Sequence, residues 1–219
     1  RYRLNSGSLQ LIRKILERKG TRMRSKRVLL IQGMGGSYIM FPYLVSKLQD
    51  AGFEPEFYAP QFLPIKDIRP HARAVALKCR ELARESGRPV ALIGYSMGGL
   101  VAVAAVQIYG AADFVDTIIT IGSPFQGTPL AKIAGAVLGK LYISLRQMSP
   151  QSSFLDFLKR RVSKKLTIHC IGGAYDTIVW GAENAMHPQA DEKIILPATH
   201  LMLPFLAVND IIRILKSKE

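Results

Sequence analysis

A serine stands at the centre of residues 94–98, which read Gly-Tyr-Ser-Met-Gly. A continuous apolar run at 89–93 precedes it and predicts a buried strand, whereas 99–108 has an apolar, helical pattern. Where a strand turns directly into a helix, the residue in the middle of the turn has a strained backbone. Side chains two positions before and two positions after it would collide, so glycine is needed at both of these positions. The turn would push the Ser96 side chain outward, beside the free N–H groups of the helix N-terminus. This context predicts that Ser96 is a nucleophile.

Ser123 also follows a predicted strand, over 117–121, and is an alternative nucleophile. The next residue is Pro124, which has no N–H group to offer to an oxyanion. We therefore expect Ser123 to be a loop residue near the site.

One of the four histidines differs from the others in its position. His71 lies at the start of a predicted helix, His169 lies inside a predicted strand, and His187 lies in a polar loop, so each has an ordinary structural interpretation. His200 comes directly after the last predicted strand and before the terminal helix. We predict that His200 is the general base, which takes the proton of Ser96 and returns it to the leaving group.

The position of the acid follows from the sheet edge, because ligands of parallel sheets bind at the carboxyl ends of the strands. The carboxylates between the serine and the histidine are Asp113, Asp116, Asp156, Asp176, Glu183, Asp191 and Glu192. Of these, Asp176 alone closely follows a predicted strand, and Glu183 is a distant second. We predict that Asp176 orients the His200 ring and stabilises the imidazolium.

A glycine-rich stretch at 33–36 joins the predicted strand 28–31 to a helix. It does not fit a nucleotide-binding loop, because Tyr38 stands where a dinucleotide fingerprint needs glycine and the lysine of the Walker pattern is absent. The alternative is an oxyanion loop. Its donors would be the backbone N–H groups of Met34 and Met97, each contributing roughly 3 kcal/mol to transition-state stabilisation.

Strands and helices alternate along the whole chain. We predict strands at 28–31, 57–59, 89–93, 117–121, 166–171 and 193–196, and helices at 38–50, 67–85, 99–108 and 201–216. This order predicts an α/β fold with a mostly parallel central sheet and helices on both faces.

In these motifs and residues, the chain resembles the α/β-hydrolase family, and within it small bacterial triacylglycerol lipases and related esterases. The likeness covers about 28–206 and rests on the motifs at 29–36, 94–99 and 121–129 (Ile-Gly-Ser-Pro-Phe-Gln-Gly-Thr-Pro) with the predicted acid and base. It implies the α/β-hydrolase fold and an ester substrate. It also implies that Ser96, Asp176 and His200 form a catalytic triad and that Met34 and Met97 are the oxyanion donors.

One motif departs from the family pattern. The first motif usually begins with His-Gly, whereas here it begins with Gln32 and Gly33. Because the oxyanion contact comes from the backbone, we expect it to survive this change.

Composition favours one globular catalytic domain at 28–219. The chain has 219 residues, of which 48% are hydrophobic and 21% charged, enough for a single domain with its own core. The only cysteines, Cys79 and Cys170, are expected to be buried free thiols and not part of a disulfide framework or a metal-ligand cluster. We therefore expect no metal and no cofactor.

Within that domain, 128–163 could form a small lid or cap. The stretch 128–148 is nearly all apolar and carries apolar residues at helical spacing: Ile133, Val137, Leu141, Leu145 and Met148. A helix that packs on the domain and a cap that lines an acyl site both remain open. Either predicts an apolar pocket, which suits acyl chains.

The net charge of +14 is concentrated at the start of the chain, because residues 1–27 hold ten Lys or Arg and one Glu, a net of 10 − 1 = +9. We treat 1–27 as a basic extension with a short apolar face formed by Leu9, Leu11, Ile12, Ile15 and Leu16. It could bind an anionic membrane surface or pack on the domain, and both remain open. No specific nucleic acid is expected as a partner.

No apolar run reaches the roughly 20 residues that span a bilayer. The chain begins at Arg1 and not at Met, which is compatible with an upstream signal or anchor, so membrane association and export both remain open.

Three classes of function stay open. The leading prediction is a serine hydrolase that cleaves carboxylic esters, as a lipase or esterase. The second is a thioesterase, phospholipase or acyltransferase that uses the same triad. The third, a lipid-binding relative without catalysis, is disfavoured because the triad is complete.

Overall fold

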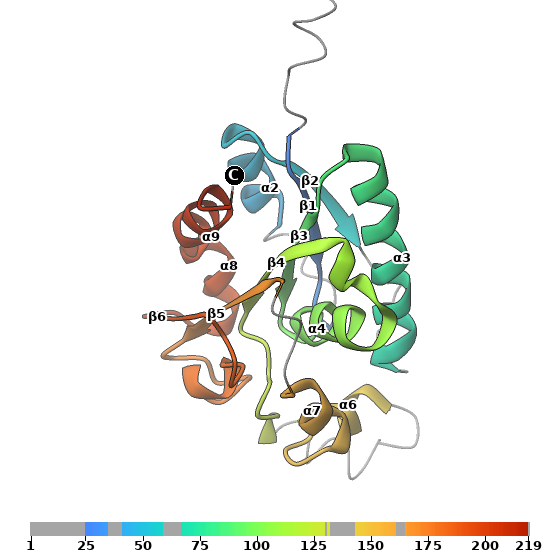
Figure 1. Ribbon diagram of the computed structural model, residues 1–219. Coiled ribbons are helices and arrows are strands. Elements are labelled where there is room, and N and C mark those ends of the chain that lie inside the picture. The colour runs from blue at the N-terminus through green and yellow to red at the C-terminus, as the bar shows by residue number, and fades with distance from the viewer. Residues whose placement is uncertain are drawn as a thin grey trace, which may run out of the picture.

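Six parallel strands form one sheet in the order β2-β1-β3-β4-β5-β6 (Figure 1). The computed structural model describes residues 25–34, 41–58, 67–129, 131, 143–160 and 165–218. The strands are β1 (Arg27–Ile31), β2 (Glu54–Tyr58), β3 (Val90–Tyr95), β4 (Val115–Ile121), β5 (Thr167–Gly173) and β6 (Glu192–Leu196). The predicted α/β fold with a mostly parallel sheet is confirmed, and within the described residues every strand pair is parallel.

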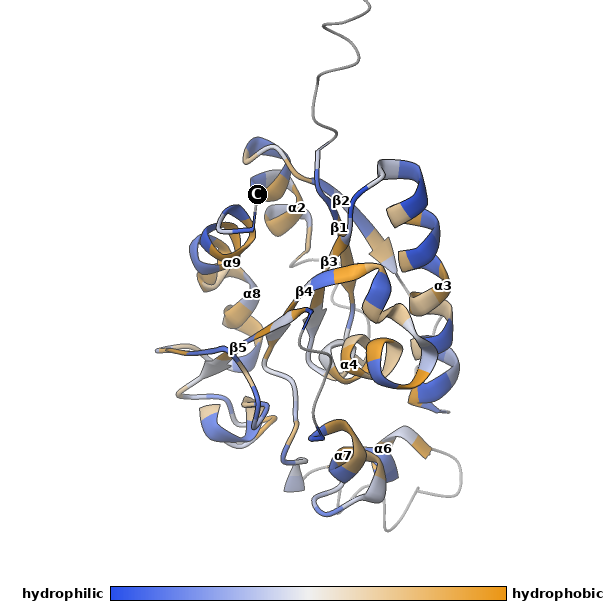
Figure 2. Ribbon diagram, viewed as in Figure 1, coloured by the Kyte–Doolittle hydropathy of each residue, from blue (hydrophilic) through white to orange (hydrophobic). Residues whose placement is uncertain are grey.

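Helices cover both faces of the sheet (Figure 1). One face carries α2 (Phe41–Asp50), α8 (Leu203–Leu206) and α9 (Val208–Lys216), and the other carries α3 (Ile68–Ser86) and α4 (Met97–Tyr109). The short helices α6 (Ile143–Gln147) and α7 (Ser153–Leu158) pack against α3 and α4. Alternate residues of β1 face opposite sides: Leu29 packs in the core with α3 and α4, and Leu30 packs in the core with α2 and α9. Figure 2 shows the hydrophobic residues gathered along the central strands and in α4.

Two predicted elements differ in their extent. β2 begins at Glu54, three residues before the predicted strand. The prediction missed these residues because all five residues of this edge strand are exposed or half-buried, so its first half shows no apolar run. The single predicted helix 201–216 is wrong: a 3-10 turn (His200–Met202) is followed by the separate helices α8 and α9. Pro204 lies in the first turn of α8, where a missing N–H group is tolerated, so it accounts for the start of a new helix after the 3-10 turn and not for the separation of α8 from α9.

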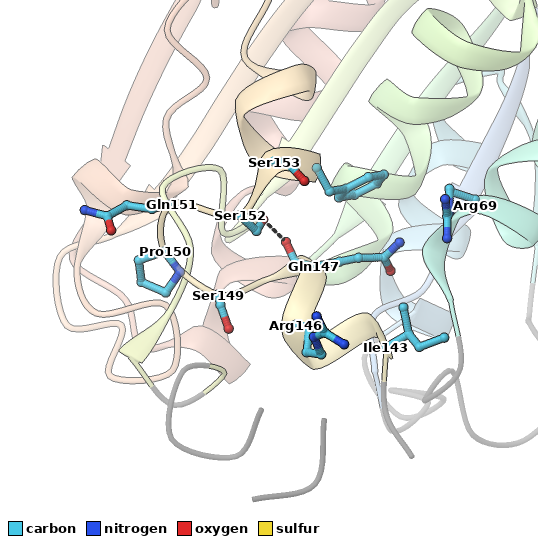
Figure 3. A pocket seen from close by; sticks show the side chains of 10 residues that line it. Arg69, Ile143, Arg146, Gln147, Ser149, Pro150, Gln151, Ser152 and Ser153 are labelled. Atoms are coloured by element: carbon cyan, nitrogen blue, oxygen red, sulfur yellow. Dashed lines mark hydrogen bonds between the residues drawn. The ribbon is translucent and has the colours of Figure 1, made fainter. Parts of the chain in front are cut away.

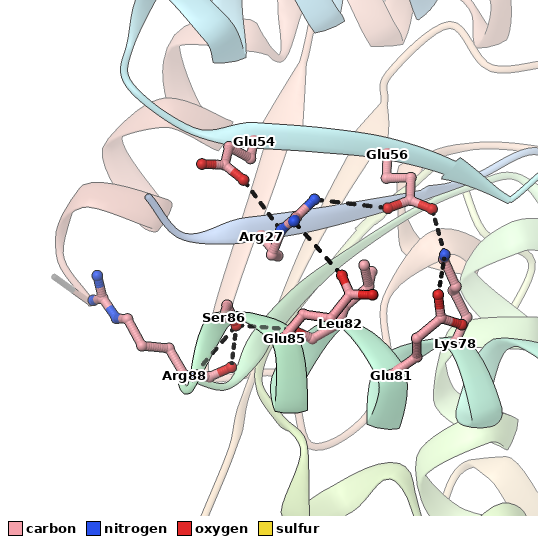
Figure 4. A network of polar contacts seen from close by, with 9 residues as sticks. All are labelled: Arg27, Glu54, Glu56, Lys78, Glu81, Leu82, Glu85, Ser86 and Arg88. Atoms are coloured by element: carbon pink, nitrogen blue, oxygen red, sulfur yellow. Dashed lines mark hydrogen bonds and ion pairs between the residues drawn. The ribbon is translucent and has the colours of Figure 1, made fainter. Parts of the chain in front are cut away.

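Ion pairs join β1, β2 and α3 at one edge of the sheet (Figure 4). The Arg27 guanidinium lies 3.1 Å from Glu54 and 3.6 Å from Glu85, and the Lys78 amine lies 2.6 Å from Glu56. Lys26 is buried and its amine lies 2.9 Å from the Asp116 carboxylate. Two cations of the basic segment 1–27 thus pair with the domain. Residues 1–24 lie outside the described residues, so the extension stays a prediction.

The predicted lid segment 128–163 falls partly outside the described residues, at 130, 132–142 and 161–164, and those gaps include Ile133, Val137 and Leu141. In the described part, Met148 is buried in the core on the α4 side of the sheet, and Leu145 packs against that core. No helix in the described ranges is long and apolar enough to cross a membrane.

Candidate active site

Ser96 lies in the turn between β3 and α4. Its backbone is strained, with φ +53° and ψ −125°, and its N–H donates to the Ile121 carbonyl 2.8 Å away. A Cβ atom on Gly94 would lie 2.5 Å from the backbone of Gly99, and one on Gly98 would collide with the Ile31 carbonyl. The turn therefore needs both glycines, as the motif predicts.

Asp176 and His200 are in direct contact. The Nδ1 atom of His200 lies 2.6 Å from Oδ2 of Asp176, and both side chains are buried. The other carboxylate oxygen, Oδ1, accepts the N–H groups of Ile178 at 3.0 Å and Val179 at 2.9 Å. Since both oxygens are engaged, the orientation of the carboxylate toward the imidazole is fixed.

Sequence reasoning missed Tyr95. Its hydroxyl donates to the His200 carbonyl oxygen at 3.1 Å, and the two rings lie 5.0 Å apart with a 36° tilt. Burial, reinforced by the charge of Asp176, raises the pKa of Tyr95, so the phenol stays protonated and able to donate. Its place on a buried strand, directly before Ser96, is the only signal that could have indicated it.

Three neighbouring strands, β3, β4 and β5, hold these groups at their carboxyl ends. Tyr95 pairs in register with Ile121, and Ile121 pairs with Ile171. A Cβ atom on Gly122, the residue after β4, would lie 3.1 Å from Cε1 and Nδ1 of His200. The imidazole therefore lies over the end of β4, between the strands that carry Ser96 and Asp176. In the described ranges no hydrogen bond joins the Ser96 hydroxyl to His200, and such contacts often tighten only when substrate binds.

The first glycine-rich stretch lies against the serine. A Cβ atom on Gly33 would lie 2.8 Å from Cβ of Ser96, so Met34 follows a residue in contact with it. Met97 is the first residue of α4 and directly follows Ser96. Among the described residues, neither the Met34 nor the Met97 N–H donates to a backbone acceptor. The role of these two N–H groups as oxyanion donors stays a prediction.

Ser123 packs away from this arrangement. It is buried, and a Cβ atom on Gly99 would collide with its hydroxyl, so Ser123 faces α4. Its hydroxyl has no hydrogen-bond partner within the described parts of the chain.

The remaining histidines each have a protein partner. His71 lies 3.1 Å from the Tyr58 hydroxyl, His169 lies 3.0 Å from Glu192, and Nε2 of His187 lies 2.8 Å from the Leu158 carbonyl. These contacts agree with their structural interpretation. Three of the carboxylates that we did not choose as the acid lie in other surroundings. Asp116 pairs with Lys26, Asp191 accepts the Ile168 N–H, and Glu183 is exposed in a 3-10 turn (Ala182–Ala185).

Two hollows lie near the carboxyl ends of the strands. A cleft of about 760 Å³ between α3 and the pair α6–α7 is lined by both charged and apolar residues, among them Arg69, Arg146 and Phe154 (Figure 3). Its lining includes none of Ser96, Asp176 and His200, so this cleft is separate from the apolar acyl pocket that we expected at the catalytic residues. A smaller hollow of about 300 Å³ is lined by Asp176 and its neighbours, including Tyr175 and Trp180.

The described residues offer little for metal or thiol chemistry. No group of three His, Cys, Asp or Glu in the described ranges could hold a metal ion. Cys79 and Cys170 are buried free thiols, as predicted, and burial raises the pKa of Cys79 to about 12 and raises that of Cys170 as well. Neither forms a thiolate nucleophile at neutral pH.

Known proteins share this fold. The mature lipase BlEst2 of Bacillus licheniformis aligns with a TM-score of 0.73 and 19% identity, over 88% of this chain and 92% of that one. Lipase B of Aspergillus fumigatus aligns with a TM-score of 0.67 and 19% identity, over 82% of this chain and 49% of that one. A monoacylglycerol lipase of Paleococcus ferrophilus aligns with a TM-score of 0.61 and 15% identity, over 88% and 95%. At these identities the likeness establishes the fold alone.

No curated protein matches the chain in sequence. A family model described as the PGAP1-like alpha/beta domain matches residues 71–203, a stretch that includes Ser96, Asp176 and His200. The chain therefore belongs to the PGAP1-like alpha/beta domain family and has the α/β-hydrolase fold.

Proposed function

We propose that the chain is a serine hydrolase that cleaves carboxylic esters, with lipid-like acyl esters as its substrates. The observation that carries this proposal is the 2.6 Å contact between Asp176 and His200 at the edge of the sheet where Ser96 occupies a strained turn. Membership of a hydrolase-fold family adds support, although the fold itself accommodates many reactions.

In this mechanism an Nδ1–H of His200 donates to Asp176, which leaves Nε2 free to accept a proton. Oγ of Ser96 attacks the ester carbonyl carbon while its proton passes to Nε2, and the carbonyl π electrons move onto oxygen. The Met34 and Met97 N–H groups would stabilise this oxyanion. The intermediate collapses, and the departing alkoxide takes the proton from Nε2, leaving an acyl-enzyme. Water then attacks the acyl-enzyme by the same steps, with His200 as the base, which releases the carboxylic acid and restores Ser96.

The choice of lipid-like esters has two supports. Proteins of similar fold include a lipase of Bacillus licheniformis and a monoacylglycerol lipase of Paleococcus ferrophilus. In addition, aromatic side chains, those of Tyr175 and Trp180, line the hollow beside Asp176. A thioesterase, phospholipase or acyltransferase would use the same groups and differ only in the leaving group or in the acceptor of the acyl chain.

A panel of aryl esters and aryl thioesters with acyl chains of increasing length tests the proposal. We expect wild type to hydrolyse the esters, faster for longer chains, and Ser96→Ala to lose this activity. Faster turnover of the thioesters would favour the second class. Equal turnover by wild type and Ser96→Ala would reject the proposed nucleophile.

We further propose that the basic segment 1–27 brings the enzyme to anionic lipid. Without Lys26 and Arg27, which pair with the domain, residues 1–24 hold eight Lys or Arg and one Glu, and this net charge of 8 − 1 = +7 supports the proposal. At low salt, deletion of 1–24 should weaken sedimentation with anionic vesicles, and any binding that remains should no longer decrease as salt is added. Full binding by the shortened chain would reject it.

A further inference from the structure

Exposed apolar side chains stand next to the proposed catalytic groups. They are Met34, Tyr175, Ile178, Trp180, Leu201 and Met202, which we call the apolar rim. Tyr175 precedes Asp176 in the chain, Leu201 follows His200, and Met34 follows Gly33, whose backbone abuts Ser96. The Tyr175 N–H also donates to the Ala198 carbonyl at 3.1 Å, which ties the two loops that carry the acid and the base.

These loops reverse the usual division between buried apolar and exposed polar residues. Asp176 and His200 are only 3% and 5% exposed, whereas Trp180, Tyr175 and Leu201 are 68%, 65% and 60% exposed. Single exposed apolar residues are ordinary, but several on adjoining loops indicate an interaction surface.

Trp180 is held in its outward position. Its φ is +70°, a conformation that bulky residues rarely adopt. The Asn184 amide donates to the carbonyls of Val179 and Trp180, at 3.1 Å each, and the Gly181 N–H donates to the Asp176 carbonyl at 2.7 Å. The turn that presents the indole is therefore built by specific bonds.

The rim loops carry no exposed formal charge. In 174–181 and 199–206 the only acidic or basic residues are Asp176 and His200, and both are buried. Contact with an apolar phase would thus desolvate no ionised side chain at these loops. Trp and Tyr are also the residues that favour the boundary between membrane and water.

We propose that the apolar rim docks on the surface of a phospholipid bilayer. A lipid surface fits better than a protein partner, since a protein seated on the rim would close the approach to Ser96, whereas a bilayer supplies ester substrates there. This choice of occupant rests on the proposed function. The net charge of +14 adds a general attraction to anionic bilayers without selecting this face.

The sequence supplies the probe, because Trp180 is its single tryptophan. The full chain with Ser96→Ala is titrated with phosphatidylcholine vesicles at high salt, which screens any electrostatic binding by the basic segment. We expect Trp180 emission to move to shorter wavelength as the indole enters the interface. Adding Leu201→Ser and Met202→Ser should weaken partitioning by about tenfold or more, because two apolar side chains no longer insert.

A matched control separates the rim from general apolarity. Leu77 on α3 is 57% exposed, close to Leu201, and Leu77→Ser should partition like the parent. Thermal unfolding confirms that each variant is folded. No emission shift with vesicles, or equal partitioning with and without Leu201 and Met202, would overturn the proposal. Emission that moves to shorter wavelength with protein concentration in the absence of lipid would assign the rim to a second copy and also overturn it.

Hydrolysis of a soluble short-chain ester by wild type is measured separately. Hydrolysis without a vesicle-induced shift overturns the rim alone. A rim-dependent shift without hydrolysis supports the docking surface and overturns the proposed catalysis.

Discussion

The Tyr95 hydroxyl donates to the His200 carbonyl oxygen, 3.1 Å away, although 105 residues separate the two along the chain. Tyr95 ends β3, directly before Ser96. The residue next to the proposed nucleophile thus holds the backbone of the proposed base, and Tyr95 acts as a positioning residue.

Tyr95→Phe should lower kcat by about tenfold with little change in KM, since a lost hydrogen bond of about 1 kcal/mol displaces the base without altering substrate contacts. Tyr58→Phe is the control: its hydroxyl also contacts a histidine, His71, at 3.1 Å, but on the edge strand β2. Steady-state kinetics with a soluble ester compares them. Equal loss in both variants would contradict a positioning role for Tyr95.

Asp176→Asn should lower kcat by about 10⁴-fold and leave the fold intact, because the amide favours the wrong imidazole tautomer. Asp191→Asn is the matched control, since Asp191 also accepts a backbone N–H, that of Ile168 at 2.8 Å, but does not contact His200. If both variants lose activity to a similar extent, the acid lies elsewhere.

Gly33→Ala and Gly98→Ala should fail in different ways. A Cβ atom on Gly33 would lie 2.8 Å from Cβ of Ser96 and 3.0 Å from the Tyr95 carbonyl oxygen. The Ser96 side chain would have to move, and its displacement should lower kcat by about tenfold or more. A Cβ atom on Gly98 would meet the Ile31 backbone, which cannot easily move, so this variant should lose stability. Kinetics and thermal midpoints measure the two effects. Full activity in Gly33→Ala would remove the first stretch from the site.

Asp67 should make stability depend on pH at the acidic end. Burial would raise the pKa of Asp67, but hydrogen bonds from Arg69 and Gln147 outweigh it and lower the pKa from 3.8 to about 2. Because the folded pKa is below the unfolded value, this stabilisation is present above about pH 4 and is lost as the pH falls toward 2. Asp67→Asn should therefore be less stable than wild type near neutrality, and urea titrations should show the difference narrowing below pH 4. A difference that is constant with pH would contradict this.

The sequence predicted the parts of the site that depend on position in the sheet. Asp176 and His200 were predicted because they follow strands of a parallel sheet, and in the structure their side chains are in contact. Local chemistry indicated Ser96, since the flanking glycines have a steric cause.

Features set by distant packing were missed. The hydrogen bond from Tyr95 to the His200 carbonyl depends on how the segments after two different strands pack together. The positive φ of Trp180 goes with hydrogen bonds from the Asn184 side chain. By contrast, the boundary between the 3-10 turn and α8 was open to prediction from Pro204, because proline interrupts helical hydrogen bonding and favours the first turn of a helix.

Reaction with a phosphonate ester probe, followed by intact mass and peptide mapping, tests the proposed nucleophile most directly. We predict one label per chain, carried by Ser96, and no label on Ser96→Ala. A label on Ser123, or stoichiometric labelling of Ser96→Ala, would contradict the account.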